Sequence, residues 1–400
     1  MLTNVTTLGE KLRSANYSTH AIGKWHLGIC NKAFWPTNRG FDHFSGFMGG
    51  TTDYYTHKIV DGYDYRADTD VDYTANGTYD TTLIRDKANE VISGHDKNSP
   101  LFLYLPFHAP HDPLQVEKSY QDMYSDIPDV SRQKYLGMVT ALDDAVGSII
   151  DSLKQSELYE NSIIVFLSDN GAPGGNWPPS MGGYVMEYGA SNWPLRGSKL
   201  TLFEGGTRTV SFIHSPKYIT PRVETGMVHA TDWFPTLLSA AGLDHDEDVD
   251  GVDQWEKMKN SSLPEPRQEM LYNLYIPPKD VYGIWDAIDS WPPISAIRLG
   301  DWKYIWRAYG FDGWSSPAEQ GTDHEPGVPK EVKHQLYNLA SDPLEKENLA
   351  EVEPEIADML LNKLIATYEG MGAAGNFSYP PPTPAGRPEN HGGIWEDGWC

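Results

Sequence analysis

An aspartate and an asparagine follow the most apolar segment of the chain. Residues 163–167 read Ile-Ile-Val-Phe-Leu, and Asp169, Asn170 and Gly171 come directly after the next residue. Such a run predicts a strand buried on both faces of a parallel sheet, and ligands bind beyond the carboxyl ends of such strands. A carboxylate beside an amide offers the oxygen donors that Ca²⁺ or Mg²⁺ takes. The alternative is an Asp-Asn-Gly turn without a ligand.

Basic and imidazole side chains follow other predicted strands or lie in the adjoining loops. They are Lys24, His26, His111 and Lys199. Each alone has a plain structural explanation, as a surface charge or a hydrogen-bonded histidine. Beside a divalent cation, however, such groups describe a pocket for a tetrahedral oxyanion, in which they bind the peripheral oxygens and stabilise charge on the departing oxygen. The combination indicates sulfate or phosphate ester hydrolysis.

The composition is that of an acidic, folded protein. The chain has 400 residues, a hydrophobic content of 39% and a formal net charge of −25. This length predicts a large α/β domain with a smaller second domain. The net charge argues against nucleic acid or an anionic membrane surface as partner. No apolar run reaches the roughly 18 residues that a membrane span needs.

Alternating helices and strands are predicted as far as residue 263. A Thr7–Glu10 capping box starts a short helix, strands are expected at 18–22, 101–105, 163–167 and 210–214, and helices at 82–92 and 135–153. After residue 263 the pattern changes to short strands at 270–275, 296–299, 302–305 and 335–339 and a helix near 356–364. We therefore predict a large α/β domain at 1–263, an antiparallel α+β subdomain at 264–372 and a Pro-, Gly- and Trp-rich tail at 373–400.

Three further aspartates are expected to have structural roles. Asp143 and Asp144 lie on the amphipathic helix at 135–153, where a solvated helix face explains them better than a metal does. Asp232 precedes Trp-Phe-Pro-Thr at the start of another predicted helix, so we expect it to be an N-cap.

Several ordered motifs bear a resemblance to a known family. The segment at 23–28, Gly-Lys-Trp-His-Leu-Gly, resembles the second signature of the sulfatase family. The segments at 36–42, 111–115, 192–197 and 336–343 are similar to further family motifs and follow in the family's order. The resemblance covers essentially the whole chain and extends to the arylsulfatase B-like (N-acetylgalactosamine-4-sulfatase-like) branch.

This resemblance implies a fold, a cofactor and a substrate class. The fold would be alkaline-phosphatase-like, with a mixed, mostly parallel sheet flanked by helices and a smaller C-terminal subdomain of antiparallel sheet plus helix. One Ca²⁺ would be bound by a ligand set that includes Asp169 and Asn170. The substrate would be a sulfated sugar, such as a sulfated N-acetylgalactosamine, or an aryl sulfate, and the protein would be lysosomal or secreted.

The resemblance also implies individual roles. Lys24, His111 and Lys199 would contact the sulfate group. His26 would orient the nucleophile, and either His111 or Lys199 would assist the departing oxygen.

Two parts of the family pattern have no counterpart at a matching place. Family members carry a Cys-x-Pro-x-Arg signature, whose cysteine is oxidised to the nucleophile formylglycine, and an Asp-Asp pair that completes the metal site. Here Cys30 precedes Asn-Lys-Ala-Phe, and Cys400 is the last residue. In the family both parts precede the segment that matches the Thr7 helix. The resemblance therefore implies that the chain lacks its first strand and nucleophile segment and is an incomplete or inactive form of a sulfuric ester hydrolase.

Two alternatives stay open. The chain is a non-catalytic protein that binds sulfated glycans, or it is a phosphatase or phosphodiesterase of the same superfold. The motifs at 23–28 and 192–197 disfavour the second alternative.

Two further features bear on the compartment. Sequons at Asn4, Asn16, Asn76, Asn260 and Asn376 favour a secretory route, although the N-terminus shows no signal peptide pattern. In a secreted protein we expect Cys30 and Cys400 to pair. The tail that carries Cys400 is long enough to cross back to the segment at 23–28, which would bring Trp395 and Trp399 to the sugar-binding side.

Overall fold

The computed structural model describes residues 4–173, 189–245, 248–274, 295–308, 313–320, 324–325, 332–370 and 386–397. Its helices are α1 (Leu8–Ser14), α2 (Asp80–Gly94), α3 (Lys118–Asp122), α4 (Val130–Gln155), α5 (Glu204–Thr207), α6 (Trp233–Ala240), α7 (Trp255–Lys259) and α8 (Pro354–Gly370). The first strands are β1 (Ser18–Lys24), β2 (His43–Phe47), β3 (Lys58–Ile59), β4 (Gly62–Tyr63), β5 (Arg66–Ala67), β6 (Asp70–Val71), β7 (Leu101–Tyr104), β8 (Ile164–Leu167) and β9 (Ser211–His214). The C-terminal strands are β10 (Glu269–Asn273), β11 (Ser295–Leu299), β12 (Trp302–Ala308), β13 (Trp314–Ser315), β14 (His324–Glu325) and β15 (Val332–Asn338).

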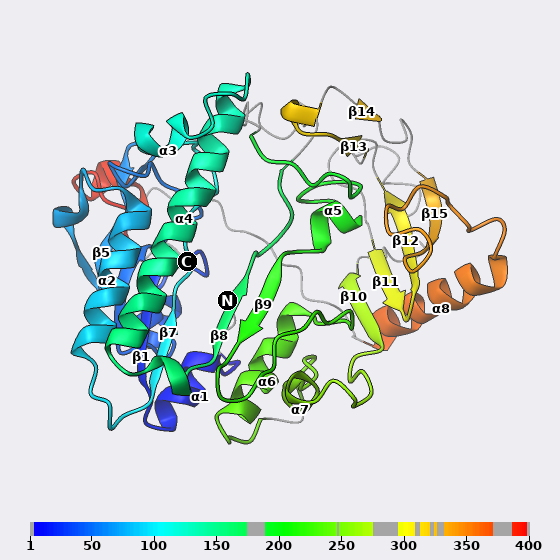
Figure 1. Ribbon diagram of the computed structural model, residues 1–400, viewed down its shortest axis with the longest axis horizontal. Helices are drawn as coiled ribbons and strands as arrows, with labels where there is room; N and C mark the ends of the chain where they lie inside the picture. Colours follow the sequence, from blue (N-terminus) through cyan, green and yellow to red (C-terminus); the bar gives the residue numbers. More distant parts are fainter. Residues whose placement is uncertain are drawn as a thin grey trace.

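A five-stranded mixed sheet forms the centre of the N-terminal body. Its order is β6-β5-β2-β1-β7, and β1 runs parallel to both β2 and β7. Helices α2 and α4 lie side by side over this sheet (Figure 1). Their apolar faces meet β1 in a buried cluster that includes Ile22, Ile84, Ala88, Ile92 and Ile149. This packing fixes the carboxyl ends of β1 and β7, where the predicted site residues begin.

Strand β8 differs from its predicted environment. It pairs antiparallel with β9 in a separate two-stranded sheet, and its side chains are half-buried, with Leu167 44% exposed. The prediction of a parallel strand buried on both faces is therefore wrong for the described structure. Among the described strands, β8 pairs on one edge only, with β9, and β7 likewise pairs only with β1.

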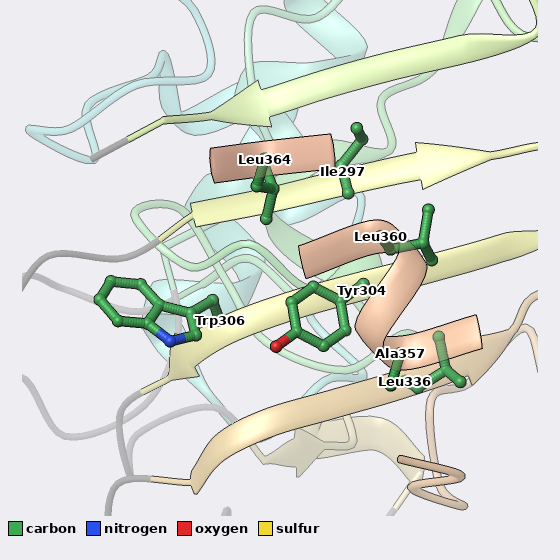
Figure 2. Packing of buried hydrophobic residues seen from close by; sticks show 7 residues of the cluster. All are labelled: Ile297, Tyr304, Trp306, Leu336, Ala357, Leu360 and Leu364. Carbon is green, nitrogen blue, oxygen red and sulfur yellow. The ribbon is translucent and has the colours of Figure 1, made fainter. Parts of the chain in front are cut away.

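The C-terminal body is an antiparallel sheet covered by a helix. The order is β10-β11-β12-β15, and β11 turns into β12 through Gly300, whose φ of +56° suits glycine. Helix α8 packs on this sheet (Figure 2). The buried residues between them are Ile297, Tyr304, Trp306, Leu336, Ala357, Leu360 and Leu364. The predicted antiparallel sheet plus helix is confirmed, whereas the boundaries at 263 and 372 stay predictions.

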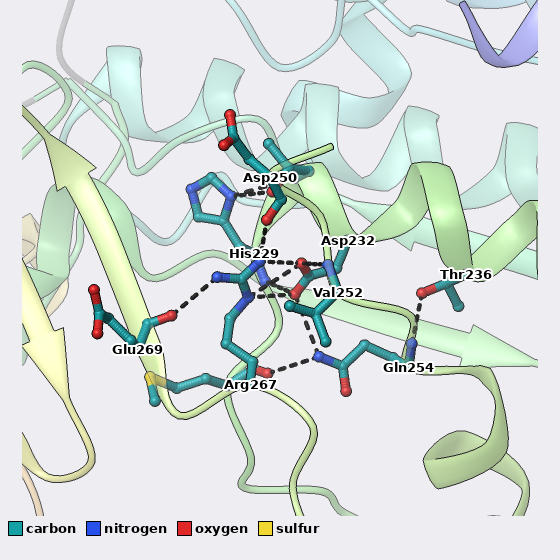
Figure 3. Close-up of polar contacts among 10 residues, drawn as sticks. His229, Asp232, Thr236, Asp250, Val252, Gln254, Arg267 and Glu269 are labelled. Atoms are coloured by element: carbon teal, nitrogen blue, oxygen red, sulfur yellow. Dashed lines mark hydrogen bonds and ion pairs between the residues drawn. The ribbon is translucent and has the colours of Figure 1, made fainter. Parts of the chain in front are cut away.

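The three aspartates expected to be structural differ in burial. Asp143 and Asp144 are exposed on α4, as expected. Asp232 does not cap α6 with its side chain. It is fully buried and accepts hydrogen bonds from the His229 backbone N–H at 2.8 Å and from Nε of Arg267 at 2.8 Å (Figure 3). Asp232 therefore occupies the N-cap position of α6, as expected, but its carboxylate is engaged by the Arg267 guanidinium and not by a helical N–H of α6.

The tail returns to the N-terminal body. The Tyr63 backbone N–H donates to the carbonyl of Gly393 at 2.7 Å, and Nη2 of Arg66 donates to the carbonyl of Trp395 at 2.6 Å. Cys30 is disulfide-bonded. Cys400, the only other cysteine of the sequence, lies outside the described residues, as do Trp399 and Asn376. None of the helices described is long and apolar enough to cross a bilayer.

Candidate active site

Lys24 and His26 are positioned by the end of β1. The Lys24 backbone N–H donates to the carbonyl of Pro106 at 2.8 Å, and the His26 N–H donates to the carbonyl of Met48 at 3.2 Å. The His26 ring lies against Gly50, where an added Cβ would come within 2.8 Å of two ring atoms. A side chain at position 50 would therefore displace the imidazole.

A buried carboxylate holds the loop that supports His26. Asp64 is 3% exposed and accepts from the Met48 N–H at 2.9 Å and the Gly49 N–H at 2.7 Å. Burial raises the pKa of Asp64, against the opposing effect of these two hydrogen bonds. Because Gly50 follows directly, Asp64 orients the backbone on which the His26 ring rests.

His111 lies in the loop after β7. Its Nδ1 is 2.8 Å from the carbonyl oxygen of Asp112 and 3.1 Å from the carboxylate of the same residue. A carbonyl can only accept, so Nδ1 carries a proton and only a protonated ring has a second donor at Nε2. The hydroxyl of Tyr54 donates to the His111 carbonyl at 2.8 Å and so holds the backbone of this loop in place.

Lys199 and the pair Asp169–Asn170 belong to neighbouring loops that Asn192 ties together. The Lys199 N–H donates to the carbonyl of Ala172 at 3.0 Å. The Asn192 side chain accepts from the Ala172 N–H at 2.8 Å and donates to the carbonyls of Ala172 at 2.8 Å and Gly197 at 3.1 Å. Its amide thus closes the loop that presents Lys199 onto the loop that follows Asp169.

The charges of these residues act on one another. Burial lowers the pKa of Lys24, Asp169 opposes this change, and Lys199 adds to it. Burial also lowers the pKa of His26, as do the charges of Lys24, Lys199 and His111. Such mutual effects require short separations. The structure therefore brings all the predicted cationic residues and Asp169 into one electrostatic cluster.

His111 is part of the same cluster. Burial lowers its pKa, Asp112 raises it, and Lys24 and Lys199 lower it further. In a cluster of groups that oppose each other's protonation, a bound anion stabilises the protonated forms because it offsets the repulsion between them. The site is therefore suited to bind an oxyanion.

The metal ligands predicted from sequence are accessible but few. Asp169 is exposed, and Asn170 is half-buried and donates from its amide to the Gly171 carbonyl at 2.9 Å. In the described part of the chain, no three His, Cys, Asp or Glu side chains cluster as a metal site. Ca²⁺ takes about six to eight oxygens. These two residues alone do not fit a complete calcium site.

A buried pair behind His111 was not found from sequence. His108 Nδ1 lies 3.8 Å from Oδ2 of Asp80, and both residues are buried. Burial raises the pKa of Asp80 to about 7 and lowers that of His108 well below its ordinary value. The His-x-x-His spacing of residues 108 and 111 was the available signal, because it places two imidazoles in one loop, 5.7 Å apart.

The fold and the site together define an α/β protein that gathers positive charge at the carboxyl end of a mixed sheet. The model of the sulfatase family matches residues 2–243. The chain therefore belongs to the sulfatase family.

Two relatives illustrate the relation. Arylsulfatase J of Mus musculus is 37% identical over 413 residues, which cover 97% of this chain and 66% of that protein. N-acetylgalactosamine-6-sulfatase of Homo sapiens is 28% identical over 258 residues, which cover 61% of this chain and 47% of that protein. The chain spans about two thirds of the first relative's length.

Solved structures support the fold. The crystal structure of Ps i-CgsB in complex with k-i-k-neocarrahexaose superposes with a TM-score of 0.74 at 24% identity and covers 95% of this chain and 77% of that one. A protein in complex with its substrate D-glucosamine-2-N,6-O-disulfate superposes with a TM-score of 0.60 at 18% identity, covering 94% and 84%. The predicted alkaline-phosphatase-like α/β fold is confirmed.

Proposed function

We propose that this chain recognises the sulfate group of a sulfated sugar or an aryl sulfate with the binding groups of a sulfuric ester hydrolase of the arylsulfatase B-like branch. Lys24, His111 and Lys199 bind the peripheral oxygens, and His26 faces the reacting group. The observation that carries the proposal is the placement of these side chains at the carboxyl end of β1, in the loop after β7 and in the loop that Ala172 joins to Lys199, where their charges act on one another. A sulfate monoester supplies the single negative charge that relieves their repulsion.

Hydrolysis needs a nucleophile in addition to these groups. The 400 residues contain no Cys-x-Pro-x-Arg motif. Binding groups alone do not replace an activated nucleophile. We therefore propose binding without appreciable turnover for this chain, and turnover where a formylglycine segment is supplied. The same absence favours the second candidate, a protein that binds sulfated glycans without cleaving them.

Metal binding and location complete the proposal. Asp169 and Asn170 are proposed as two ligands of one Ca²⁺, and further oxygen ligands would complete its coordination. A lysosomal or secreted location agrees with the disulfide at Cys30, because such bonds persist in oxidising compartments.

A comparison of two esters tests the proposal. We expect 4-nitrophenyl sulfate to bind and to be hydrolysed negligibly. Lys199→Ala should weaken binding by about ten- to a hundredfold, since a charge-assisted hydrogen bond contributes about 1.5–3 kcal/mol. Asp143→Ala is the control and should change nothing, because that carboxylate is exposed on α4. Equal effects of the two substitutions, or turnover of 4-nitrophenyl phosphate in preference to the sulfate, would refute it.

A further inference from the structure

The segment that presents Lys199 is joined to the C-terminal sheet by buried charges. Arg196 precedes Lys199 by three residues and is 3% exposed. Its Nη1 donates to the hydroxyl of Tyr337 on β15 at 2.8 Å and to the carbonyl of Glu345 at 3.1 Å. A residue adjacent to the anion site thus has its hydrogen-bond partners in the other body of the protein.

A second cation, which lies in the C-terminal sheet, binds Glu204 on the C-terminal side of Lys199. Nζ of Lys303, on β12, lies 2.8 Å from Oε1 of Glu204 and 2.9 Å from Oε1 of Glu345. The Glu204 backbone N–H donates to Oε2 of Glu345 at 2.7 Å. Lys303 and Glu345 are fully buried, and Glu204 is 4% exposed. Arg196, Glu204, Lys303 and Glu345 form what we call the buried charge network, with two positive and two negative groups.

Aromatic rings enclose the guanidinium of the network. The Arg196 guanidinium carbon lies 3.9 Å from the ring centroid of Phe203 and 4.8 Å from that of Trp314. A flat, delocalised cation stacks on such rings, whereas a lysine ammonium at the same place would lose the stacking and one of the two hydrogen bonds. The position is therefore specific for arginine.

The network holds the backbone on both sides of Lys199. The Gly205 N–H donates to the Arg196 carbonyl at 2.6 Å, which closes the loop between them. The Gly197 N–H donates to the carbonyl of Gly313, near β13, at 2.9 Å. An added Cβ at Gly205 would lie 2.5 Å from the Arg196 oxygen, so the closure requires glycine there. The backbone that carries Lys199 is consequently held in place relative to β12 and β15.

We propose that the buried charge network is the positioning device for Lys199, and that the C-terminal sheet thereby takes part in recognising the sulfate group. Lys303, Tyr337 and Glu345 lie beyond residues 2–243, the part that the family model matches. Buried ion pairs contribute little net stability compared with apolar residues of the same shape. Their value here is the fixed geometry that they impose on a flexible lysine next to them. The inference rests on the proposed function, because Lys199 contacts sulfate only in that proposal.

A double-mutant cycle on the full chain tests the inference, with 4-nitrophenyl sulfate as the titrated ligand. Arg196→Lys should weaken binding by about tenfold or more, and Lys199→Ala by about ten- to a hundredfold. The double variant should bind within about twofold of Lys199→Ala alone, because Arg196 acts through Lys199. Additive losses, or full affinity in Arg196→Lys, would overturn the inference.

A matched control separates positioning from general stability. Leu360→Ala removes a buried side chain between α8 and the same sheet without touching the network. It should destabilise the C-terminal body yet leave the affinity for 4-nitrophenyl sulfate within about twofold of the parent chain. If Leu360→Ala weakens binding as much as Arg196→Lys, the network has only a structural role.

Amide hydrogen exchange gives a readout without a ligand. In Arg196→Lys and Glu345→Gln, exchange should accelerate about tenfold or more for residues 197–206 while β11 and β12 stay protected. The reverse pattern is expected for Leu360→Ala. Unchanged protection of 197–206 in both network variants would overturn the inference. If the parent chain binds no sulfate ester but this pattern holds, the proposed function fails and the positioning of Lys199 stands.

Discussion

Substitution of Lys303 by methionine isolates the energetic role of the buried charge network. The substitution keeps the length of the side chain but leaves the carboxylates of Glu204 and Glu345 buried and without their common cation. Burial alone would lower the pKa of Lys303, but the charges of Glu345 and Glu204 hold it above its ordinary value. The two carboxylates therefore favour the charged form of the buried lysine.

The expected loss is large for one substitution. Removing one partner of a buried ion pair costs about 3–5 kcal/mol. Unfolding of all 400 residues as one unit has an entropy of about 0.84 kcal/mol/K, so Tm should fall by about 4–6 °C. Adding Glu204→Gln and Glu345→Gln to Lys303→Met should restore most of this loss, because neither carboxylate is then left charged and without Lys303.

The loss should also depend on pH in a defined direction. Burial raises the pKa of Glu345 in the native protein, and Lys303 opposes this effect. Without Lys303 the folded variant binds a proton on Glu345 more tightly than the unfolded chain does. The stability of the variant is then retained at pH values below the ordinary pKa range of glutamate. It falls as pH rises through the pKa of Glu345 in the folded variant. Thermal melts at pH 5 and pH 8 should show the larger deficit at pH 8.

Two results would refute this reasoning. One is a Lys303→Met variant within about 1 kcal/mol of the parent at pH 8, below the cost expected for an unpaired buried charge. The other is a triple variant that is less stable than Lys303→Met.

Three further predictions concern the site and the disulfide. Burial and the neighbouring lysines lower the pKa of His111, so the affinity for sulfate esters should rise as pH falls from 8 to 5. The substitution His111→Gln should remove most of that rise. An affinity of the parent chain that does not change over this pH range would contradict the prediction. If Asp169 binds Ca²⁺, added Ca²⁺ should raise the Tm of the parent chain by ligand linkage but not that of Asp169→Asn; equal responses contradict the assignment. Reduction of the bond at Cys30 should lower stability by about 2–5 kcal/mol, and peptide mapping without reductant should recover Cys30 linked to Cys400; two free thiols would contradict the pairing.

The sequence was sufficient for elements whose signals are local. The Thr7–Glu10 capping box forms as expected, with the Glu10 N–H donating to the threonine hydroxyl at 3.1 Å. The hairpin at Gly300 and the helix that carries Asp143 also follow from turn chemistry and periodicity. These features depend on residues within one or two turns of each other, so no distant partner decides them.

The features that sequence could not give depend on partners far along the chain. The burial of β8 depends on which strands flank it, and an apolar run carries no information about its neighbours. Asp232 precedes a helix and so has the sequence signal of an N-cap, but its partner Arg267 lies 35 residues away. Arg196 stood within a recognised motif, yet its role depends on Tyr337 and Glu345, which no spacing rule connects to it.

The return of residues 386–397 to β4 changes how the C-terminal body is attached. The backbones of Tyr63 and Ile394 form a parallel bridge, and Nε1 of Trp395 donates to the carbonyl of Ile59 at 3.2 Å. The antiparallel sheet and α8 are therefore an insertion within the first body, anchored at its entry and its exit, and not an appendage on a single hinge. Contact with the first body on both sides of the C-terminal body restricts the swinging motion that one linker would permit. For the same reason, proteolytic cleavage within the C-terminal body would leave both fragments attached to the first sheet.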